Sequence, residues 1–153
     1  MTKKFGAAVG LIVVACAVCV LQFGRAQDKA ATQGTVKAKV HYKGSGTVDD
    51  KHKILVFLFD SPEFVHGGAM PFAVMGASSK DGTVTFSEIA KSPVYVSAVY
   101  DPKGAYEGQM GPPPAGVSLG IYSKTPGEPA PVKVEAGKTA TVDFTFDDTV
   151  KMQ

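Results

Sequence analysis

The chain has 153 residues, the length of one domain with a hydrophobic core of its own. Its 16 basic and 14 acidic residues give a formal net charge of +2, but three of the basic residues (Lys3, Lys4 and Arg25) lie in an apolar N-terminal segment. The remaining 13 basic residues are interspersed with the 14 acidic ones. The rest of the chain therefore has no basic patch, which argues against nucleic acid as a partner.

The N-terminal segment has the three parts of a secretory signal peptide. Two lysines precede an uninterrupted apolar run of fifteen residues, Ala7 to Leu21, and Gly24 and Ala26 place small residues at positions −3 and −1 of a cleavage site. The run is shorter than the roughly 20 apolar residues that a transmembrane helix needs. We therefore expect residues 1–26 to form a cleaved signal-peptide helix, residues 27–33 to form a flexible linker, and the protein to be periplasmic or secreted in a bacterium.

A second interpretation of the leader is lipidation at Cys16. Val13 to Cys16 fits the bacterial lipoprotein pattern, and acyl chains on this cysteine would tether the protein to a membrane. However, the apolar run continues beyond Cys16 to Leu21, whereas a lipoprotein becomes polar straight after its cysteine. We expect both cysteines of the chain to be small apolar residues of the leader, so that the mature domain holds no disulfide. Contact with a membrane is then expected only through the signal peptide or a lipid anchor.

The first strands are indicated by hydrophobic periodicity. Apolar and polar residues alternate from Thr35 to Tyr42, which predicts a half-buried strand with one polar face. Residues Ile54 to Phe59 are apolar at every position, which is typical of a central strand buried on both faces. A short strand is expected at 72–75. Lys80-Asp81-Gly82 then predicts a tight hairpin turn that leads into the strand 83–86.

Further strands are expected in the second half of the chain. Val94 to Tyr100 is rich in β-branched and aromatic residues, and Val117 to Tyr122 regains this character after a loop rich in glycine and proline. Val132 and Val134 predict a short strand, and Thr139 to Phe146 alternates with apolar residues on one face.

Seven or eight short strands of this kind, with turn signals at spacings near 8 to 12 residues, predict an all-β fold. We expect an antiparallel β-sandwich over residues 34–148, followed by a tail at 149–153. The only helical turn is expected near residues 87–91.

Residues 80–98 resemble the core of carboxypeptidase-regulatory-like (prealbumin-like) sandwich domains. The resemblance is carried by Lys80-Asp81-Gly82-Thr83-Val84-Thr85-Phe86, by Ile89 and by Pro93-Val94-Tyr95-Val96-Ser97-Ala98. Gly34-Thr35-Val36 and Val134-Glu135-Ala136-Gly137-Lys138 look like that family's first and last hairpins. The resemblance implies a prealbumin-like or immunoglobulin-like sandwich and an accessory, non-catalytic role, a binding or structural module of the cell envelope.

The sequence departs from the family's pattern in two places. Ala90-Lys91-Ser92-Pro93 stands where the family has a corner with proline and glycine, and the loop rich in glycine and proline is an insertion. The chain also lacks the C-terminal Tyr-Arg-Gly-Ser of the related transthyretin-like hydrolases.

The inserted loop, residues 104–116, is the preferred candidate for a binding site. It is longer than most loops, and the loops of β-sandwiches often carry binding because the sheets hold them rigid. Tyrosine offers a large contact area with a polar tip. We expect a surface that binds a protein or carbohydrate partner, without a cofactor, formed by Tyr100, Asp101, Tyr106, Gln109 and Tyr122. The alternative is a long connection stiffened by its prolines.

A metal site is the alternative function. His66, Met70 and Met75 lie within ten residues of one another, and Met110 lies in the inserted loop. Imidazole and thioether ligands suit Cu(I), so these four residues suggest a periplasmic copper carrier, although core packing explains the methionines equally well. A third interpretation, a small hydrolase centred on His66, lacks a nucleophile motif. We therefore expect no enzyme and no catalytic residue.

Overall fold

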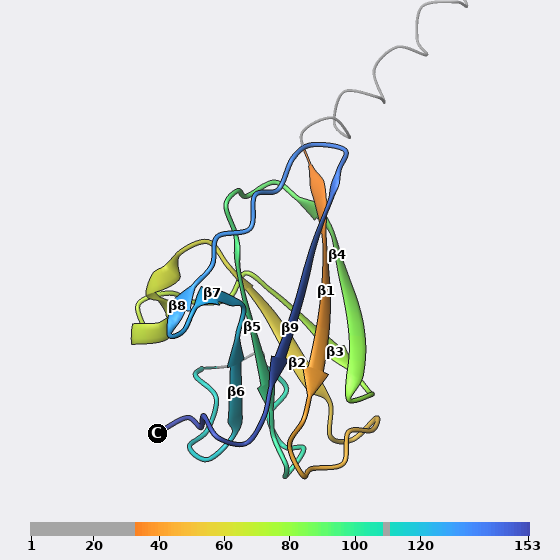
Figure 1. Cartoon of the computed structure of the whole chain (residues 1–153), viewed down its shortest axis with the longest axis vertical. Coiled ribbons are helices and arrows are strands. Elements are labelled where there is room, and N and C mark those ends of the chain that lie inside the picture. Colours follow the sequence, from red (N-terminus) through yellow and green to blue (C-terminus); the bar gives the residue numbers. More distant parts are fainter. Residues whose placement is uncertain (1–32, 109–110) are drawn as a thin grey trace, which may run out of the picture.

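The computed structural model describes residues 33–108 and 111–153, which form an all-β fold (Figure 1). The expected signal peptide, Cys16 and the linker up to residue 32 lie outside these ranges. The elements in chain order are β1 (Gly34–Tyr42), β2 (Ile54–Phe59), the 3-10 helix η2 (Pro62–His66), β3 (Ala73–Ala77), β4 (Asp81–Ile89), β5 (Tyr95–Tyr100), β6 (Ser118–Ile121), β7 (Ser123–Thr125), β8 (Glu128–Pro129) and β9 (Thr139–Phe146).

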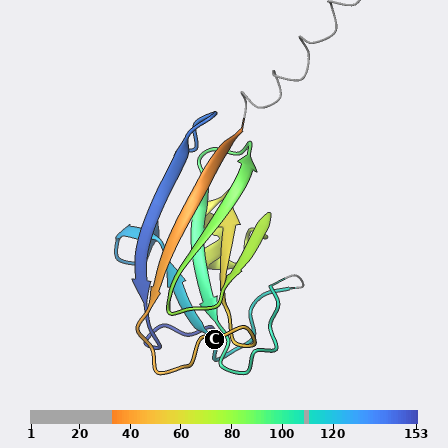
Figure 2. The ribbon, with the colours of Figure 1, turned by 90° about the vertical axis from the view of Figure 1, so that its right-hand side faces the viewer.

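Two sheets account for most of the strands. One has the order β4-β1-β9, the other has the order β3-β2-β5-β6, and β7 pairs only with β8. In Figure 1 and Figure 2 the strands of the three-stranded sheet lie together on one side of the molecule and are separate from β5 and β6, which belong to the other sheet. Because the two sheets share one buried core, the fold is β-sandwich-like.

The core lies between the two sheets and is filled by every second side chain of the strands. In β1 these residues are Val36, Ala38, Val40 and Tyr42, each no more than 1% exposed. Burying a side chain such as valine contributes about 1.5–3 kcal/mol relative to leaving it in water. The core partners from the other main strands are Ile54, Val56, Leu58, Val84, Phe86, Val96, Ala98, Tyr100, Val142, Phe144 and Phe146. The predicted alternation of the strands is thus confirmed.

One strand pair departs from the antiparallel arrangement that the sequence predicts. β1 and β9 run parallel, in register from Thr35 beside Thr139 to Tyr42 beside Phe146. The other neighbouring strands in the two sheets are antiparallel. Turn signals indicate direction only for strands joined by a hairpin, and almost the whole domain separates β1 from β9.

The prediction of a hairpin turn at Lys80-Asp81-Gly82 is wrong. Asp81 and Gly82 begin β4, and the chain turns at residues 78–80, between two strands that belong to different sheets. Gly82 does not have a positive φ angle. A Cβ atom at this position would lie 2.5 Å from the Cβ of Ala77, so the glycine permits the close crossing from β3 to β4.

Two further local expectations are corrected. The helical turn expected at residues 87–91 is absent from the described structure, because β4 continues to Ile89, and the described helix is η2. The short strand expected at Val132 and Val134 is reduced to a single bridge, in which the N–H of Val94 donates to the carbonyl of Val132 over 3.0 Å and the reverse bond measures 2.8 Å.

The outer face of the three-stranded sheet is polar, as predicted for β1. The ring of His41 lies between two carboxylates, with its Nδ1 2.6 Å from Asp81 Oδ1 and its Nε2 3.0 Å from Asp143 Oδ1. The Nζ of Lys39 lies 3.5 Å from the same aspartate, Asp143. Exposed pairs of this kind contribute little to stability, and they keep this face in contact with water.

A single carboxylate, that of Asp148, connects several segments at one end of the sandwich. It accepts hydrogen bonds from Tyr42 Oη (2.5 Å), Ser118 Oγ (2.7 Å), and both the backbone N–H (2.9 Å) and the hydroxyl (3.2 Å) of Ser45. These donors, led by the tyrosine hydroxyl, hold the pKa of Asp148 well below its ordinary value. Burial, together with the bond to this carboxylate, raises the pKa of Tyr42 to about 12.

The residues expected to form a C-terminal tail are paired with β6. The N–H of Leu119 donates to the carbonyl of Val150 (2.9 Å), and the N–H of Met152 donates to the carbonyl of Val117 (3.0 Å). The N–H of Gly116 donates to the carbonyl of Met152 (2.9 Å). Residues 150–152 therefore cover the free edge of β6.

Replacing Asp148 by asparagine is expected to lower the free energy of unfolding by about 2 kcal/mol near neutral pH, because an ionised acceptor of four hydrogen bonds is lost. The pKa of Asp148 is lowered in the folded state, so its contribution is present above the unfolded value near 3.8 and is lost as the pH falls below that value. Urea unfolding at several pH values between about 6 and 2 measures this difference.

The matched control is Asp50→Asn at an exposed carboxylate, which is expected to leave the unfolding midpoint unchanged. Wild-type stability of D148N at neutral pH would contradict the role given to this carboxylate.

Candidate functional site

The four-stranded sheet carries a second apolar cluster on its outer face. Phe57, Phe59 and Val99 point away from the shared core, yet they are only 3%, 8% and 2% exposed. The partly buried residues that pack against this cluster include Leu55, Phe64, Val74, Tyr95, Tyr106, Leu119 and Met152. The prediction that Ile54 to Phe59 is buried on both faces is therefore confirmed. The outer cover consists of two loops.

Between these two loops lies a groove of about 320 Å³, which we call the outer groove. Its floor is the outer face of β2, β5 and β6. One wall is the segment that contains η2, and the other is the loop between β5 and β6. In Figure 2 this second loop extends on the side away from β9. The lining residues are Phe57, Phe59, Phe64, Val65, Gly67, Ala69, Met70, Pro71, Ser97, Val99, Tyr106, Gly111, Pro112, Pro113, Leu119, Ile121 and Met152.

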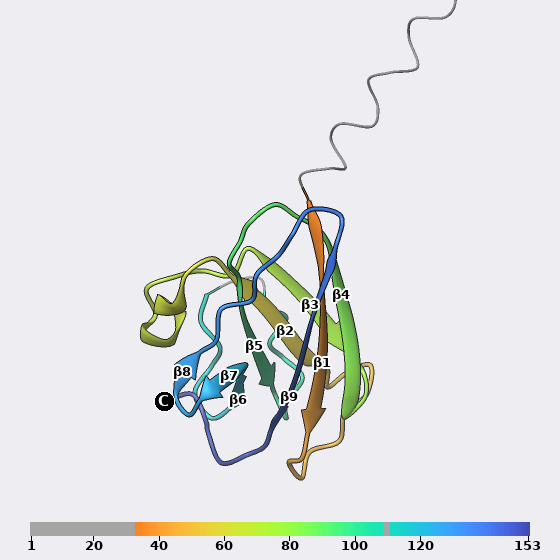
Figure 3. The ribbon, with the colours of Figure 1, turned by 45° about the horizontal axis from the view of Figure 1, so that its top comes forward.

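The first wall is a helical turn with a defined start and end. Ser61 caps η2 by accepting a hydrogen bond from the N–H of Glu63 (3.2 Å). Gly67 ends it with a φ of +74°, a left-handed conformation in which only glycine is free of strain. The ring of Phe64 stacks on that of Phe59, with centroids 4.2 Å apart and planes at 12°. Figure 1 and Figure 3 show η2 on the same side of the molecule as the β7–β8 hairpin.

The second wall depends on Asp101, at the end of β5. Its carboxylate is 5% exposed and accepts three backbone N–H groups, from Lys103 (2.8 Å), Ala105 (2.9 Å) and Tyr106 (3.0 Å). Burial alone would raise the pKa of Asp101, but the three donors outweigh it and lower the pKa. The carboxylate thus fixes the first turn of the loop.

Tyr106 and Gly108 bring the loop down onto the sheet. The ring of Tyr106 lies 6.3 Å from that of Phe57, and its hydroxyl donates to the carbonyl of Gly111 (3.1 Å). Burial raises the pKa of Tyr106. A Cβ atom at Gly108, whose φ is +77°, would lie 2.9 Å from the ring of Phe57 and 3.0 Å from Val74. Only glycine allows the backbone to pass so close to these side chains.

A second cavity, of about 380 Å³, lies on the other side of Tyr106. Tyr106 lines both cavities, so the two spaces adjoin at this residue. The second cavity is lined by charged residues of both signs over an apolar floor: Asp50, Lys51, Lys53, Leu55, Val74, Gly76, Asp101, Gly104, Tyr106 and Glu107.

Of the residues predicted to form the recognition surface, Tyr106 lines the outer groove. Tyr100 lies in the shared core, 3% exposed, with its ring 4.5 Å from that of Tyr42 and its hydroxyl bonded to the carbonyl of Thr47 (2.9 Å). The carboxylate of Asp101 is hydrogen-bonded to three backbone N–H groups of its own loop. Gln109 lies outside the described residues.

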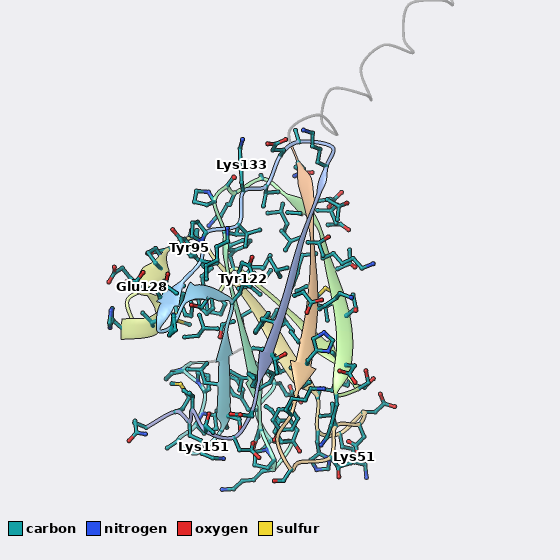
Figure 4. All side chains as sticks on the ribbon, in the orientation of Figure 1. Lys51, Tyr95, Tyr122, Glu128, Lys133 and Lys151 are labelled. Carbon is teal, nitrogen blue, oxygen red and sulfur yellow. The ribbon has the colours of Figure 1, made fainter. Side chains whose placement is uncertain are left out.

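Tyr122 lies at the other end of the sheet from Asp101. Its N–H donates to the carbonyl of Val96 (3.0 Å), near the start of β5, and its ring packs against Phe144. Figure 4 accordingly shows Tyr122 near Tyr95, far from Lys151 and Lys51 at the lower end of the molecule. The structure therefore does not bring the four described recognition residues, Tyr100, Asp101, Tyr106 and Tyr122, together on one surface.

The residues of the suggested copper site are also separated. Met70 lies at the rim of the outer groove and is 66% exposed. Met75 pairs with Val56 in the sheet, so it lies on the opposite face of the edge strand β3, where it is 40% exposed. His66 is exposed at the end of η2, and Met110 lies outside the described residues. Within the described ranges, histidine, cysteine, aspartate and glutamate form no cluster that could hold a metal ion.

Most residues of the groove were not among the predicted site residues. Phe57, Phe59 and Val99 alternate with the core residues of their strands, so the apolar character of both faces was the available signal. Phe64, Met70 and Met152 lie in segments without periodicity, and no local pattern indicates that they meet.

Replacing Asp101 by asparagine is expected to loosen the loop, because the amide presents an N–H₂ group where three N–H donors converge. We expect a loss of about 1–2 kcal/mol in the free energy of unfolding. Hydrogen exchange of the amides of Lys103, Ala105 and Tyr106, followed by NMR, is expected to speed up. The control is Glu107→Gln, an exposed carboxylate of the same loop. Equal exchange in D101N and the wild type would exclude this role for Asp101.

Comparisons with known proteins assign no family to the chain. No family model matches its sequence, and no curated protein matches it. Within residues 33–108 and 111–153, no helix has both the length and the apolar character needed to cross a membrane. The chain is therefore defined by its own geometry, an all-β, β-sandwich-like fold with an apolar groove on the outer face of the four-stranded sheet.

Proposed function

We propose that this chain is a non-catalytic binding module of an exported bacterial protein, and that the outer groove is its binding surface. The observation that carries the proposal is the groove itself, an apolar space of about 320 Å³ held open between two internally bonded walls. A concave apolar site with few polar groups is the usual form of a binding pocket, and its volume falls at the lower end of the usual range.

The surroundings of the histidines support a non-catalytic role. Within the described residues, the rings of His41 and His52 are hydrogen-bonded to aspartates, His52 to Asp49 Oδ1 over 2.9 Å. Within residues 33–108 and 111–153, no hydrogen bond joins His66 to a serine or a carboxylate. A serine hydrolase would require such a bond between its base and its nucleophile.

We extend the proposal to the architecture, as a prealbumin-like sandwich related to the carboxypeptidase-regulatory-like domains. The residues that carry this resemblance, 80–98, span β4 and most of β5. These two strands belong to different sheets and both contribute to the shared core, as the residues of a sandwich do. An accessory role is the function that such a relationship implies.

Export predicts a defined mature N-terminus. Expressed with its leader in a bacterium and recovered from the periplasm, the protein is expected to begin at Gln27, with a mass that excludes residues 1–26. Intact-mass spectrometry and N-terminal sequencing measure this. A diacylated Cys16 would instead show a lipid-anchored protein, and full-length protein retained in the cytoplasm would contradict export.

Binding through the outer groove predicts where small molecules perturb the protein. In NMR titrations with a fragment set that contains apolar, polar and charged compounds, shifts are expected at Phe59, Phe64, Val99 and Leu119. Met70→Glu places a charge at the rim and is expected to abolish these shifts for apolar fragments, because a charge opposes the transfer of an apolar group from water.

The matched control is Met75→Glu, which changes a second exposed methionine of the described residues, 40% exposed, on the opposite face of the sheet. It is expected to leave the titrations unchanged, with the unfolding midpoint of each variant measured alongside. The groove would be excluded as the binding surface if no fragment shifted its resonances, or if fragments shifted only resonances on the polar face of the β4-β1-β9 sheet.

A further inference from the structure

The side-chain hydroxyls among the described lining residues of the outer groove already form hydrogen bonds within the protein. Among the described residues that line it, none has an acidic or basic side chain, and the side-chain hydroxyls are those of Ser97 and Tyr106. The Ser97 hydroxyl donates to the carbonyl of Gly120 (3.0 Å), and the Tyr106 hydroxyl donates to the carbonyl of Gly111 (3.1 Å). Among the described lining residues, an occupant therefore finds almost no free side-chain donor and no charge.

Aromatic rings and prolines supply the contact surface. Phe57, Phe59 and Phe64 form a row in which neighbouring rings lie 6.3 Å and 4.2 Å apart, and Tyr106 adds a ring on the other side of Phe57. Pro112 and Pro113 line the opposite wall. Rings favour offset or edge-to-face contact with further rings, which adds about 0.5–1.5 kcal/mol to the burial of apolar area.

Resting on the proposed function, we infer that the outer groove binds a small, uncharged, ring-bearing apolar molecule. The absence of charge among the described lining residues matches an uncharged occupant. A carbohydrate would leave its hydroxyl groups unpaired in the groove, and an ionic group would lose its hydration without gaining a partner. The neighbouring cavity, by contrast, has charged lining residues: Asp50, Lys51, Lys53, Asp101 and Glu107.

Two fluorescent probes with the same ring skeleton test this inference on the purified mature protein. N-phenyl-1-naphthylamine is uncharged, and 1-anilinonaphthalene-8-sulfonate carries one additional sulfonate. The uncharged probe is expected to bind at least tenfold more tightly. Met70→Glu and Met70→Lys are each expected to weaken its binding more than tenfold, whereas Met75→Glu is expected to change it less than twofold. An excess of glucose or maltose is expected to displace none of it.

Other outcomes separate the ligand class from the binding surface. Equal or tighter binding of the sulfonate, or displacement by a sugar, would overturn the uncharged class and leave the groove as the binding surface. Sedimentation could instead show that the chain self-associates and that Met70→Glu abolishes this association. The occupant would then be a second copy of the chain, which would overturn the uncharged ligand class and leave the groove as the binding surface. Probe binding that neither Met70 variant weakens would overturn the inference, and fragment titrations without groove shifts would overturn the proposed function as well.

Discussion

The four-stranded sheet is apolar on both faces, and water disfavours either face when it is left open. The three-stranded sheet covers the inner face, where β1 and β9 supply side chains to the shared core. The outer face has no third sheet to cover it. The segment around η2 and the loop between β5 and β6 take that place, and described residues of both line the outer groove. The outer groove is the space that remains between them.

A loop that lies on an apolar surface must still satisfy its backbone N–H and carbonyl groups. The loop after β5 does so with the carboxylate of Asp101, which takes up three N–H groups within one turn. Asp148 plays a comparable part at the same end of the sandwich, where it joins the end of β1 to β6. Both carboxylates have a lowered pKa, because in each case donors converge on the ionised form. Two ionised side chains thus fix the connections that the apolar core cannot orient.

Whether a feature of the structure could be predicted from the sequence depends on how local the interactions are that produce it. Alternation within a strand reports burial directly, so the polar face of β1 and the double burial of β2 were predictable. The same alternation places Tyr100 with Val96 and Ala98 on the inner face, which the loop hypothesis did not take into account. The parallel pairing of β1 with β9, and the meeting of Phe64 with Phe59, depend on contacts between distant segments. No residue spacing encodes them.

The pairing of β1 with β9 has a consequence for the order in which the molecule assembles. β1 is the central strand of its sheet, and its neighbours lie far along the chain, as the separations of 40 residues between His41 and Asp81 and 104 residues between Lys39 and Asp143 show. Closing such loops costs entropy before any contact is gained, and all-β domains of this kind fold in about milliseconds to seconds. β1 therefore keeps one edge unpaired until residues 139–146 are available to pair with it. The growing chain cannot complete its core before then.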